Sequence, residues 1–545
     1  MLRLPWTLFL VLPLFGLIAS ALHFSPDSRY SNGTDCFYPL TLVVSLDGFH
    51  PAYISRHHTP RLHALLSGNH SVSAVSTPYM IPSFPSQTFP NHWTLVTGLY
   101  PTEHGVVGNT FWDPLLQSQF STGVSQSTLD SRYWGGDSLW YTVQSAYAKN
   151  VKNQQTPAPF KVATHMWPGS EAIYDPLQDP SGFRTPYYYV NYDGNETLDT
   201  KIESIFEYID MPFDDRPRLI MNYIPHADTF GHQHGIPSDR SSRIYHEFTS
   251  LLFQIDTFFT DLFTGLEQRN LTGLTNVVVM SDHGMSNVDL SEDSGKYVFW
   301  EDLLDYEHRK LIENISGFPM YGIRVRKSDE DFAMLYEIYF LLQESIQKHS
   351  PHFKVYLIED LPREWRFGPD RRFSYRVAPL WIVSEPGYYI TTKEEYAQRT
   401  NTTKLIGVHG YNNTDVDMRA LFLGTGPYFE QFAGKDPSSN TSYLQPFENV
   451  QVYQILCDMV GVLKPGANNG TFPYPLSELT DEQFNEIKLP DGWSDNSRYL
   501  KTKFPDSTYN LLWNHLADDT GMSITTAKQE SDRKTITLAP VTHSS

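Results

Sequence analysis

The chain has 545 residues, of which 40% are apolar and 19% are charged, and this composition excludes disordered, collagen-like and coiled-coil proteins. The 41 Lys and Arg against 62 Asp and Glu give a formal net charge of −21, which disfavours long nucleic acids as partners, because an acidic surface repels a polyphosphate chain. A small anionic substrate remains compatible with this charge where a bound cation reverses the local field.

The first 21 residues predict a signal peptide. Arg3 is followed by an apolar run at about 4–18 and by Ala19-Ser20-Ala21, which has the small residues of a signal-peptidase site. A retained anchor is the less favoured alternative, because the run is shorter than the roughly 20 residues that span a bilayer. We therefore expect residues 1–21 to be removed and the mature chain to have no stable membrane anchor.

Nine Asn-x-Ser/Thr sequons agree with export through the secretory pathway. They begin at Asn32, Asn69, Asn195, Asn270, Asn314, Asn401, Asn412, Asn440 and Asn469. We expect a secreted, extracellular glycoprotein, with a vacuole-like compartment as the alternative. The two cysteines, Cys36 and Cys457, exclude a disulfide scaffold and a Cys-based zinc cluster, and the sequence leaves open whether they pair.

Short apolar runs without polar alternation predict strands that are buried on both faces of a parallel sheet. These runs lie at 39–46, 218–224, 276–280 and 419–423. Apolar residues recur at helical spacing in 202–209 and 244–262, which predicts two helices packed on the core. Strands that alternate with helices predict an α/β sheet covered on both faces.

The chain is predicted to form one main domain at 22–485. Within it, about 286–403 is expected to be an inserted subdomain, because this stretch has its own helical pattern around Leu335, Leu342 and Ile346 and a polar segment near 363–372. From about 486 to 545 apolar periodicity fades, so this segment is expected to be peripheral or partly disordered. The sequence leaves the oligomeric state open.

Metal-ligand residue types follow the predicted strands. Asp47 comes directly after the first run, Asp228 and His232 follow the second, and Asp282 and His283 follow the third. In open α/β sheets the ligand crevice lies outside the carboxyl ends of the strands, so these side chains are expected to converge there.

His409 precedes the last predicted strand and is expected near the same edge of the sheet. Three Asp and three His form a nitrogen and oxygen ligand set that suits zinc better than calcium or magnesium, and six ligands are enough for two ions. His226 and His234 flank His232, so spacing alone does not decide which residues in that segment are ligands.

Thr88 has two interpretations. It precedes an apolar stretch that ends at Thr97-Gly98, so it is a candidate helix N-cap with Gly98 as the helix stop. The functional interpretation is a hydroxyl at a helix N-terminus, where backbone N–H groups also receive a phosphate. A threonine hydroxyl is a poor nucleophile unless an adjacent zinc ion lowers its pKa.

Five motifs occur in one order along the chain. They are Asp47-Gly48, Thr88-Phe89-Pro90-Asn91-His92 continuing through Thr97-Gly98-Leu99-Tyr100-Pro101, Asp228-x3-His232, Ser281-Asp282-His283-Gly284-Met285 and Gly407-x-His409-Gly410-Tyr411. On these residues the chain, from about 40 to 463, resembles the ectonucleotide pyrophosphatase/phosphodiesterase family of the alkaline phosphatase superfamily. The resemblance implies a three-layer α/β/α fold with a mostly parallel central sheet and a smaller inserted subdomain, and it makes 22–485 the phosphodiesterase catalytic domain.

The resemblance also implies a role for each site residue. The ligands of one zinc ion are Asp228, His232 and His409, and those of the second are Asp47, Thr88, Asp282 and His283. Thr88 is the implied nucleophile, which forms a covalent threonyl-phosphoryl intermediate. Asn109 is implied to bind a phosphate oxygen, Phe89 and Tyr192 to stack on a nucleobase, and the segment 166–171 to line the same pocket.

The implied function is a secreted, zinc-dependent hydrolase of phosphodiester and pyrophosphate bonds in nucleotides, dinucleotides or nucleotide sugars, which releases nucleoside 5′-monophosphates. A choline- or lysophospholipid-type phosphodiesterase on the same fold is the alternative, because acyl chains also pack on aromatic rings. A catalytically inactive secreted binding glycoprotein is the alternative of another class. It predicts at least one lost ligand, whereas all six ligands and the nucleophile are present.

The chain departs from the resemblance at four positions. Gln87, Thr110 and Gly135 stand where nucleotide-specific vertebrate members have lysines, so we expect weaker selection for a particular base or a long polyphosphate. Asn412 replaces the usual aspartate and begins a sequon. A glycan at Asn412 would crowd the site, so we expect this sequon to be unoccupied.

Overall fold

The computed structural model describes residues 27–67, 74–153, 159–177, 179–326, 331–400, 403–432 and 441–471. The predicted signal peptide (1–21) and the predicted peripheral segment (486–545) lie outside these residues. In the described part of the chain, no helix combines the length and the apolar character needed to cross a membrane.

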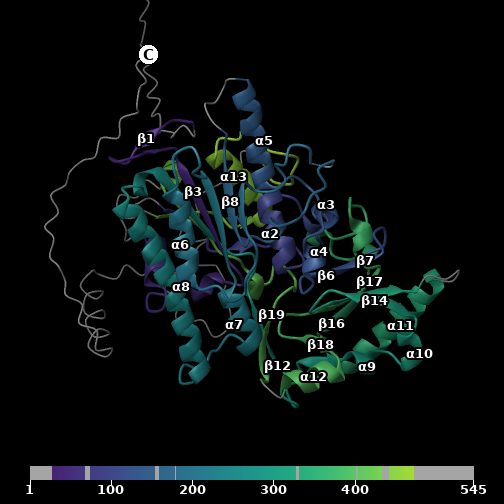
Figure 1. Ribbon diagram of the computed structural model, residues 1–545. Coiled ribbons are helices and arrows are strands. Elements are labelled where there is room, and N and C mark those ends of the chain that lie inside the picture. Colours follow the sequence, from purple (N-terminus) through teal and green to yellow (C-terminus); the bar gives the residue numbers. More distant parts are fainter. Residues whose placement is uncertain are drawn as a thin grey trace, which may run out of the picture.

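An eight-stranded mixed sheet forms the centre of the molecule, in the order β21-β4-β20-β11-β3-β10-β8-β9 (Figure 1). Its strands are β3 (Leu40–Leu46), β4 (Ala74–Ser76), β8 (Val162–His165), β9 (Tyr188–Val190), β10 (Leu219–Ile224), β11 (Thr275–Met280), β20 (Phe422–Thr425) and β21 (Thr441–Tyr443). All strands run in one direction except β20, which is antiparallel to both β11 and β4. The predicted mostly parallel sheet is confirmed, and β20 begins later in the sequence than predicted.

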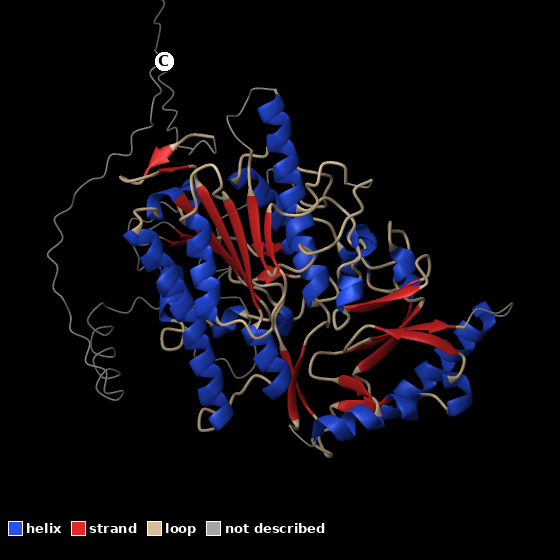
Figure 2. Cartoon of the chain, in the orientation of Figure 1, coloured by secondary structure: helices blue, strands red, loops and turns tan. Residues whose placement is uncertain are grey.

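Helices cover both faces of this sheet (Figure 2). Successive strand residues point to opposite faces, so Val43 contributes to one apolar cluster and Leu42 to the other. The first cluster includes residues of α2 (Thr88–Thr97), α5 (Leu139–Lys152) and α13 (Val452–Met459). The second includes residues of α1 (Pro60–Ser67), α6 (Leu198–Ile209) and α8 (Arg243–Gln268). The predicted three-layer α/β/α architecture is therefore confirmed.

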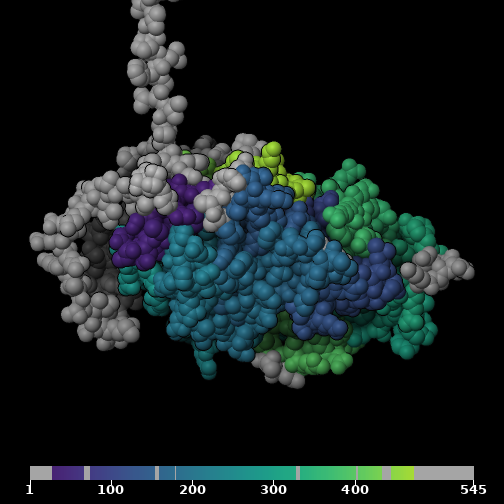
Figure 3. Space-filling view, turned by 45° about the horizontal axis from the view of Figure 1, so that its top comes forward, coloured from purple at the N-terminus to yellow at the C-terminus, as the bar shows by residue number. Residues whose placement is uncertain are grey.

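Between β11 and β20 the chain forms a second sheet in the order β14-β15-β17-β16, with its own apolar cluster. It consists of β14 (Ile312–Ser316), β15 (Tyr321–Val325), β16 (Phe353–Leu357) and β17 (Leu380–Ser384), and the adjoining helices are α9 (Trp300–Leu303), α10 (Tyr306–Arg309) and α11 (Asp331–His349). The chain leaves through β12 (Ser286–Asp289) and returns through β19 (Leu405–Val408), which pair antiparallel. The space-filling view shows this part, in green, alongside the main body (Figure 3). We refer to 286–403 as the insert; its status as a subdomain stays a prediction.

The other strands and α-helices lie outside the two sheets described above. They are β1 (Tyr30–Ser31), β2 (Cys36–Phe37), β5 (Met80–Ile81), β6 (Thr110–Asp113), β7 (Ser118–Ser121), β13 (Tyr297–Phe299), β18 (Tyr389–Thr391), β22 (Phe447–Glu448), α3 (Pro101–His104), α4 (Ser125–Thr128), α7 (His226–His234) and α12 (Lys393–Thr400). Cys36, in β2, is exposed, whereas Cys457, in α13, is buried. Both thiols are free, so no disulfide joins the two cysteines.

The structure corrects one prediction about α2. The N-cap position belongs to Gln87, and Thr88 is the first helical residue. The Thr88 hydroxyl is instead 3.3 Å from Nε2 of His283, so it faces the neighbouring strand ends and does not cap its own helix. The predicted stop is confirmed, because Gly98 has a φ of 65° and donates its N–H to the carbonyl of Thr94.

A buried ion pair fastens the insert to the main body. Nε of Arg376 lies 2.7 Å from Oδ2 of Asp113 in β6, with side chains only 2% and 0% exposed. Arg376 also donates to the carbonyls of Gly105, Tyr133 and Arg132. Burying a charge is costly unless it is paired and hydrogen-bonded, so this pair depends on both partners.

Arg376→Ala should therefore destabilise the protein by about 3–5 kcal/mol, because it leaves the carboxylate of Asp113 buried without its partner. The measurement is the thermal unfolding midpoint. Arg371→Ala is the matched control: its pair with Glu103, at 3.4 Å and 37% exposed on the arginine side, should contribute less than about 1 kcal/mol. Equal shifts of the unfolding midpoint in both variants would contradict the larger contribution expected from the buried pair of Arg376 and Asp113.

Candidate functional site

The predicted ligands lie at one edge of the central sheet. Asp47 follows β3, and Asp282 and His283 follow β11, which pairs parallel to β3. On the other side of β3, the parallel strand β10 leads into α7, which contains Asp228 and His232. The carboxyl ends of these three strands are adjacent, which is where open α/β sheets bind ligands.

The first group of converging atoms consists of Oδ1 of Asp228 and Nε2 of His232 and His409. The carboxylate oxygen is 3.4 Å from each imidazole nitrogen, and the two nitrogens are 3.1 Å apart. Ligand atoms of a tetrahedral zinc ion, at bonds of about 2.0–2.1 Å, are about 3.3 Å from one another. The three atoms are therefore spaced as ligands of one cation would be.

The second group surrounds Nε2 of His283. This nitrogen is 3.4 Å from Oδ1 of Asp47, 3.0 Å from Oδ2 of Asp282 and 3.3 Å from Oγ1 of Thr88. The ring of His283 stacks on that of His409 at 3.7 Å, so the two groups adjoin. All seven predicted metal-site residues are thus brought together.

Backbone carbonyls fix the tautomers of all three histidines. A carbonyl oxygen can only accept, so the Nδ1 atom facing it bears the hydrogen and Nε2 keeps its lone pair, as in a histidine that binds a metal. The Nδ1–H groups donate from His232 to Gly407 (2.9 Å), from His283 to Gly284 (2.8 Å) and from His409 to Ser86 (2.9 Å). Three lone pairs therefore face the two groups of candidate ligand atoms, where bound cations would relieve the repulsion among them.

The three carboxylates have unsatisfied oxygens. Oδ1 of Asp47, Oδ1 of Asp228 and Oδ2 of Asp282 are buried and accept no hydrogen bond within the described residues. Burial, together with the charges of Asp282 and Asp228, raises the pKa of Asp47. A divalent cation would supply the missing partner of each oxygen, so the residues present fit a metal centre.

The three histidines of α7 have different surroundings, and His232 is the one that faces the other candidate ligands. Nε2 of this residue faces Asp228 and His409. The ring of His234 instead packs on Phe230 at 4.8 Å, and Nδ1 of His226 is buried without a hydrogen-bond partner in the described structure. The helical turn directs alternate histidines to different surroundings.

Asn109 is held against the start of α2. Its Oδ1 accepts the N–H of Phe89 at 2.9 Å, and its own N–H donates to Oε1 of Gln87 at 2.8 Å. The other end of the Gln87 amide donates to the carbonyl of Phe318 in the insert. The amide nitrogen of Asn109 is therefore the group left to donate to a ligand beside Thr88.

The two predicted base-stacking residues lie in different surroundings. Phe89 is half-buried, and its ring centroid is 5.9 Å from that of Trp134 and 6.0 Å from that of Phe120. Tyr192 is 54% exposed, with its ring 6.4 Å from that of Tyr223. Among the described residues no ring contact joins Phe89 to Tyr192, so the predicted sandwich around a base stays a prediction.

Two residues that were not predicted from the sequence contact the candidate ligands. The hydroxyl of Tyr223 donates to Oδ2 of Asp47. Nδ1–H of His92 donates to the carbonyl oxygen of Thr88 at 2.9 Å and lies 3.3 Å from Oδ2 of Asp282, and its Nε2 is 2.9 Å from Oγ of Ser45. Tyr223 pairs with Ser45 in register between β10 and β3. The register between the two strands could have indicated that Tyr223 lies near Asp47. For His92, the only sequence signal was its position one helical turn after Thr88.

Two glycines show how closely the chain packs here. Gly48 has a φ of 62°, and a Cβ at this position would lie 3.0 Å from Cβ of Asp228. At Gly135, where nucleotide-specific vertebrate members are expected to have a lysine, a Cβ would lie 2.7 Å from the carbonyl oxygen of His104 and 3.0 Å from the ring of Phe373. The described backbone therefore leaves no room for a lysine side chain at Gly135.

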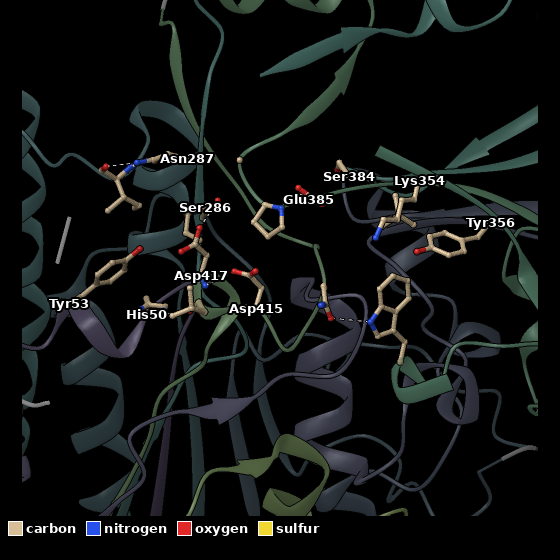
Figure 4. A pocket seen from close by; sticks show the side chains of 18 residues that line it. His50, Tyr53, Ser286, Asn287, Lys354, Tyr356, Ser384, Glu385, Asp415 and Asp417 are labelled. Atoms are coloured by element: carbon tan, nitrogen blue, oxygen red, sulfur yellow. Dashed lines mark hydrogen bonds between the residues drawn. The ribbon is translucent and has the colours of Figure 1, made fainter. Parts of the chain in front are cut away.

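A cavity of about 780 Å³ is lined by residues of both the insert and the main body (Figure 4). Its walls include Asp417 on one side and Lys354 and Tyr356 on the other. None of the predicted site residues lines it. Asn412 does line it, and its Oδ1 accepts the indole N–H of Trp365 at 3.0 Å. Occupancy of the Asn412 sequon stays a prediction.

Together the fold and the site define an α/β protein with a candidate two-cation centre at the carboxyl edge of its sheet. A sequence profile of the type I phosphodiesterase/nucleotide pyrophosphatase family matches residues 41–412. The chain belongs to this enzyme family, and its Asp and His groups agree with the family's metal sites.

Two yeast proteins and a solved mouse structure of the same family are similar to this chain. The chain is 39% identical to ectonucleotide pyrophosphatase/phosphodiesterase 1 of Saccharomyces cerevisiae, over 91% of this chain and 66% of that relative. It is 37% identical to ectonucleotide pyrophosphatase/phosphodiesterase 2 of the same yeast, over 79% of this chain and 83% of the relative. The solved structure of murine ectonucleotide pyrophosphatase/phosphodiesterase 5 matches with a TM-score of 0.62 and 26% identity, over 80% of this chain and 98% of that one.

Proposed function

We propose that this protein hydrolyses phosphodiester and pyrophosphate bonds of nucleotides, dinucleotides or nucleotide sugars, with two zinc ions and Thr88 as nucleophile, and releases nucleoside 5′-monophosphates. The observation that supports this most directly is the Thr88 hydroxyl within the second ligand group, 3.3 Å from Nε2 of His283. An inactive threonine-to-alanine form of the murine relative, in complex with AMP, supports the same role.

Zinc is the proposed metal because the donors are imidazole nitrogens and carboxylate oxygens. The ligands of one ion are Asp228, His232 and His409, and those of the other are Asp47, Thr88, Asp282 and His283. A bound pair of such ions lowers the pKa of the nucleophile and stabilises the charge on the departing oxygen.

The chain's own residues orient and attack the substrate. The amide nitrogen of Asn109 donates to a non-bridging phosphate oxygen, where charge increases in the transition state. Oγ1 of Thr88 loses its proton to solvent and forms a bond to phosphorus as the bond to the leaving oxygen breaks, which gives the threonyl-phosphoryl intermediate. Water then attacks phosphorus from the side opposite Thr88, the bond to Oγ1 breaks, and a proton from the water returns to Oγ1.

The aromatic rings of Phe89 and Tyr192 support a flat base as the recognised group, although choline or lysophospholipid diesters are the alternative. The convergence of all six ligand side chains argues against an inactive binding glycoprotein. Export is proposed from residues 1–21 and from the sequons, of which Asn195 and Asn270 are exposed.

Product analysis tests the substrate class. Incubation with ATP, a dinucleoside polyphosphate, UDP-glucose and glycerophosphocholine should give a nucleoside monophosphate from at least one nucleotide, as detected by mass spectrometry. The nucleotide rates should exceed the glycerophosphocholine rate by at least about tenfold, which corresponds to the binding contribution of one stacked base. Release of choline phosphate or choline at a comparable rate would favour the alternative substrate class.

A further inference from the structure

A buried charged cluster lies beneath the loop that contains Tyr192. Lys201, in α6, is completely buried, and its Nζ is 2.7 Å from Oε2 of Glu196. The same oxygen lies 2.7 Å from Nε2 of His165, the last residue of β8. Nδ1 of His165 is 2.9 Å from Oγ of Ser204, one turn further along α6. The cluster therefore joins a strand, a helix and the intervening loop.

The charges of this cluster depend on one another. Burial lowers the pKa of Lys201, whereas the carboxylate of Glu196 opposes that shift. Burial also opposes ionisation of Glu196, but Lys201 and His165 hold the pKa of its carboxyl below the usual range. A buried ammonium without a partner is costly, so Glu196 is fixed in place by the need to pair Lys201.

Glu196 is the one partly buried residue of an otherwise exposed loop at 191–197. Its side chain is 12% exposed, whereas Tyr192 is 54% exposed and Asp193, Gly194 and Asn195 are also exposed. The N–H of Tyr192 donates to Oε2 of Glu171 at 3.3 Å. The backbone of Tyr192 is thus tied on one side, and Glu196 ties the other end of the loop.

The same cluster contacts the segment 166–171, which the resemblance places in the base pocket. Nζ of Lys201 is 3.1 Å from Sδ of Met166. Met166 has a φ of 61°, a conformation that a non-glycine residue seldom adopts, and its N–H donates to the carbonyl of Val190 at 3.0 Å. Lys201 and Glu196 therefore fix both chain segments next to Tyr192.

We propose that Glu196 is a positioning residue, which Lys201 and His165 hold so that the ring of Tyr192 is preorganised to stack on the base of a nucleotide substrate. The inference rests on the proposed function and deepens it: selection for a nucleoside depends on a buried ion pair that does not touch the substrate. Its loss should change binding of the base and leave the chemistry at Thr88 intact.

The test compares two esters on the full-length protein, the p-nitrophenyl ester of thymidine 5′-monophosphate and methyl p-nitrophenyl phosphate, which has no base. Glu196→Gln should raise KM for the thymidine ester by about tenfold, the order of one base stacked on one ring, with kcat within about twofold. The value of kcat/KM for the methyl ester should stay within about twofold. Asp199→Asn, a matched charge change at an exposed position of α6, should leave both substrates unaffected.

A double-mutant cycle isolates the mechanism. In a Tyr192→Ala background, Glu196→Gln should have no further effect on KM for the thymidine ester, because the positioned ring is already absent. Additive effects would overturn the proposal, as would equal losses on both esters. Should Glu196→Gln fail to fold, Ser204→Ala provides a milder variant with the same expected direction, and an unchanged KM there would overturn the proposal. A wild-type protein without preference for the thymidine ester would overturn the nucleotide function itself.

Discussion

Thr88→Ala should lower kcat for a nitrophenyl phosphodiester by about 10³–10⁶-fold, the loss seen when a covalent nucleophile is removed. The reason is geometric: this hydroxyl lies within the second ligand group, 3.3 Å from Nε2 of His283. The six carboxylate and imidazole ligands are unchanged, so the zinc content per chain should remain that of the wild type. Steady-state kinetics and metal analysis of the same preparation measure both quantities.

Two control variants sharpen this experiment. Thr88→Ser keeps a hydroxyl and should retain far more activity than the alanine variant. Thr97→Ala removes a buried threonine hydroxyl from the other end of α2, where Oγ1 donates to the carbonyl of Trp93 at 2.7 Å, and should leave kcat within about twofold. Near wild-type hydrolysis by Thr88→Ala would refute the nucleophile assignment.

Metal removal should have an effect of similar size. A strong chelator followed by desalting should abolish hydrolysis, by at least about 10³-fold, and zinc should restore it. The thermal unfolding midpoint should also fall, because the metal-free protein contains three buried carboxylate oxygens that lack hydrogen-bond partners in the described structure. A ligand that binds only the folded state, such as the proposed zinc ions, stabilises that state by about 4 kcal/mol when its free concentration is 1,000 times its Kd.

Single-site variants test the division into two groups. His232→Ala should reduce the zinc content from about two ions per chain to about one, because it removes a ligand of the first group only. His234→Ala is the matched control in the same helix, since its ring packs on Phe230, and it should keep both ions. Full activity in a zinc-free protein would contradict the metal centre.

The sequence predicted the three candidate carboxylate ligands because each follows a local signal. Asp47, Asp228 and Asp282 follow apolar runs, and such runs form parallel strands whose carboxyl ends meet at one edge. The strands and helices were predicted for the same reason. A strand buried on both faces has an unbroken apolar run, and a helix buried on one side has apolar residues at helical spacing. These signals extend over only a few residues and need no knowledge of the fold.

Other features required contacts between segments far apart in the chain. The reversed direction of β20 has no sequence signal, because an apolar run reads the same in a parallel or an antiparallel strand. The hydroxyl of Tyr223 meets Asp47 only through the register of two strands. The choice of His232 over its neighbours depends on which face of α7 meets His409.

The sequence by itself determined which chemical groups this protein has, and their order along the chain placed it in a family. Tertiary structure alone decided which groups share a centre, which residues support them, and that Lys201 and Glu196 are paired beneath an exposed loop. The physical reason is that local propensity depends on neighbouring residues, whereas ligand geometry and the pairing of buried charges depend on distances that only packing fixes.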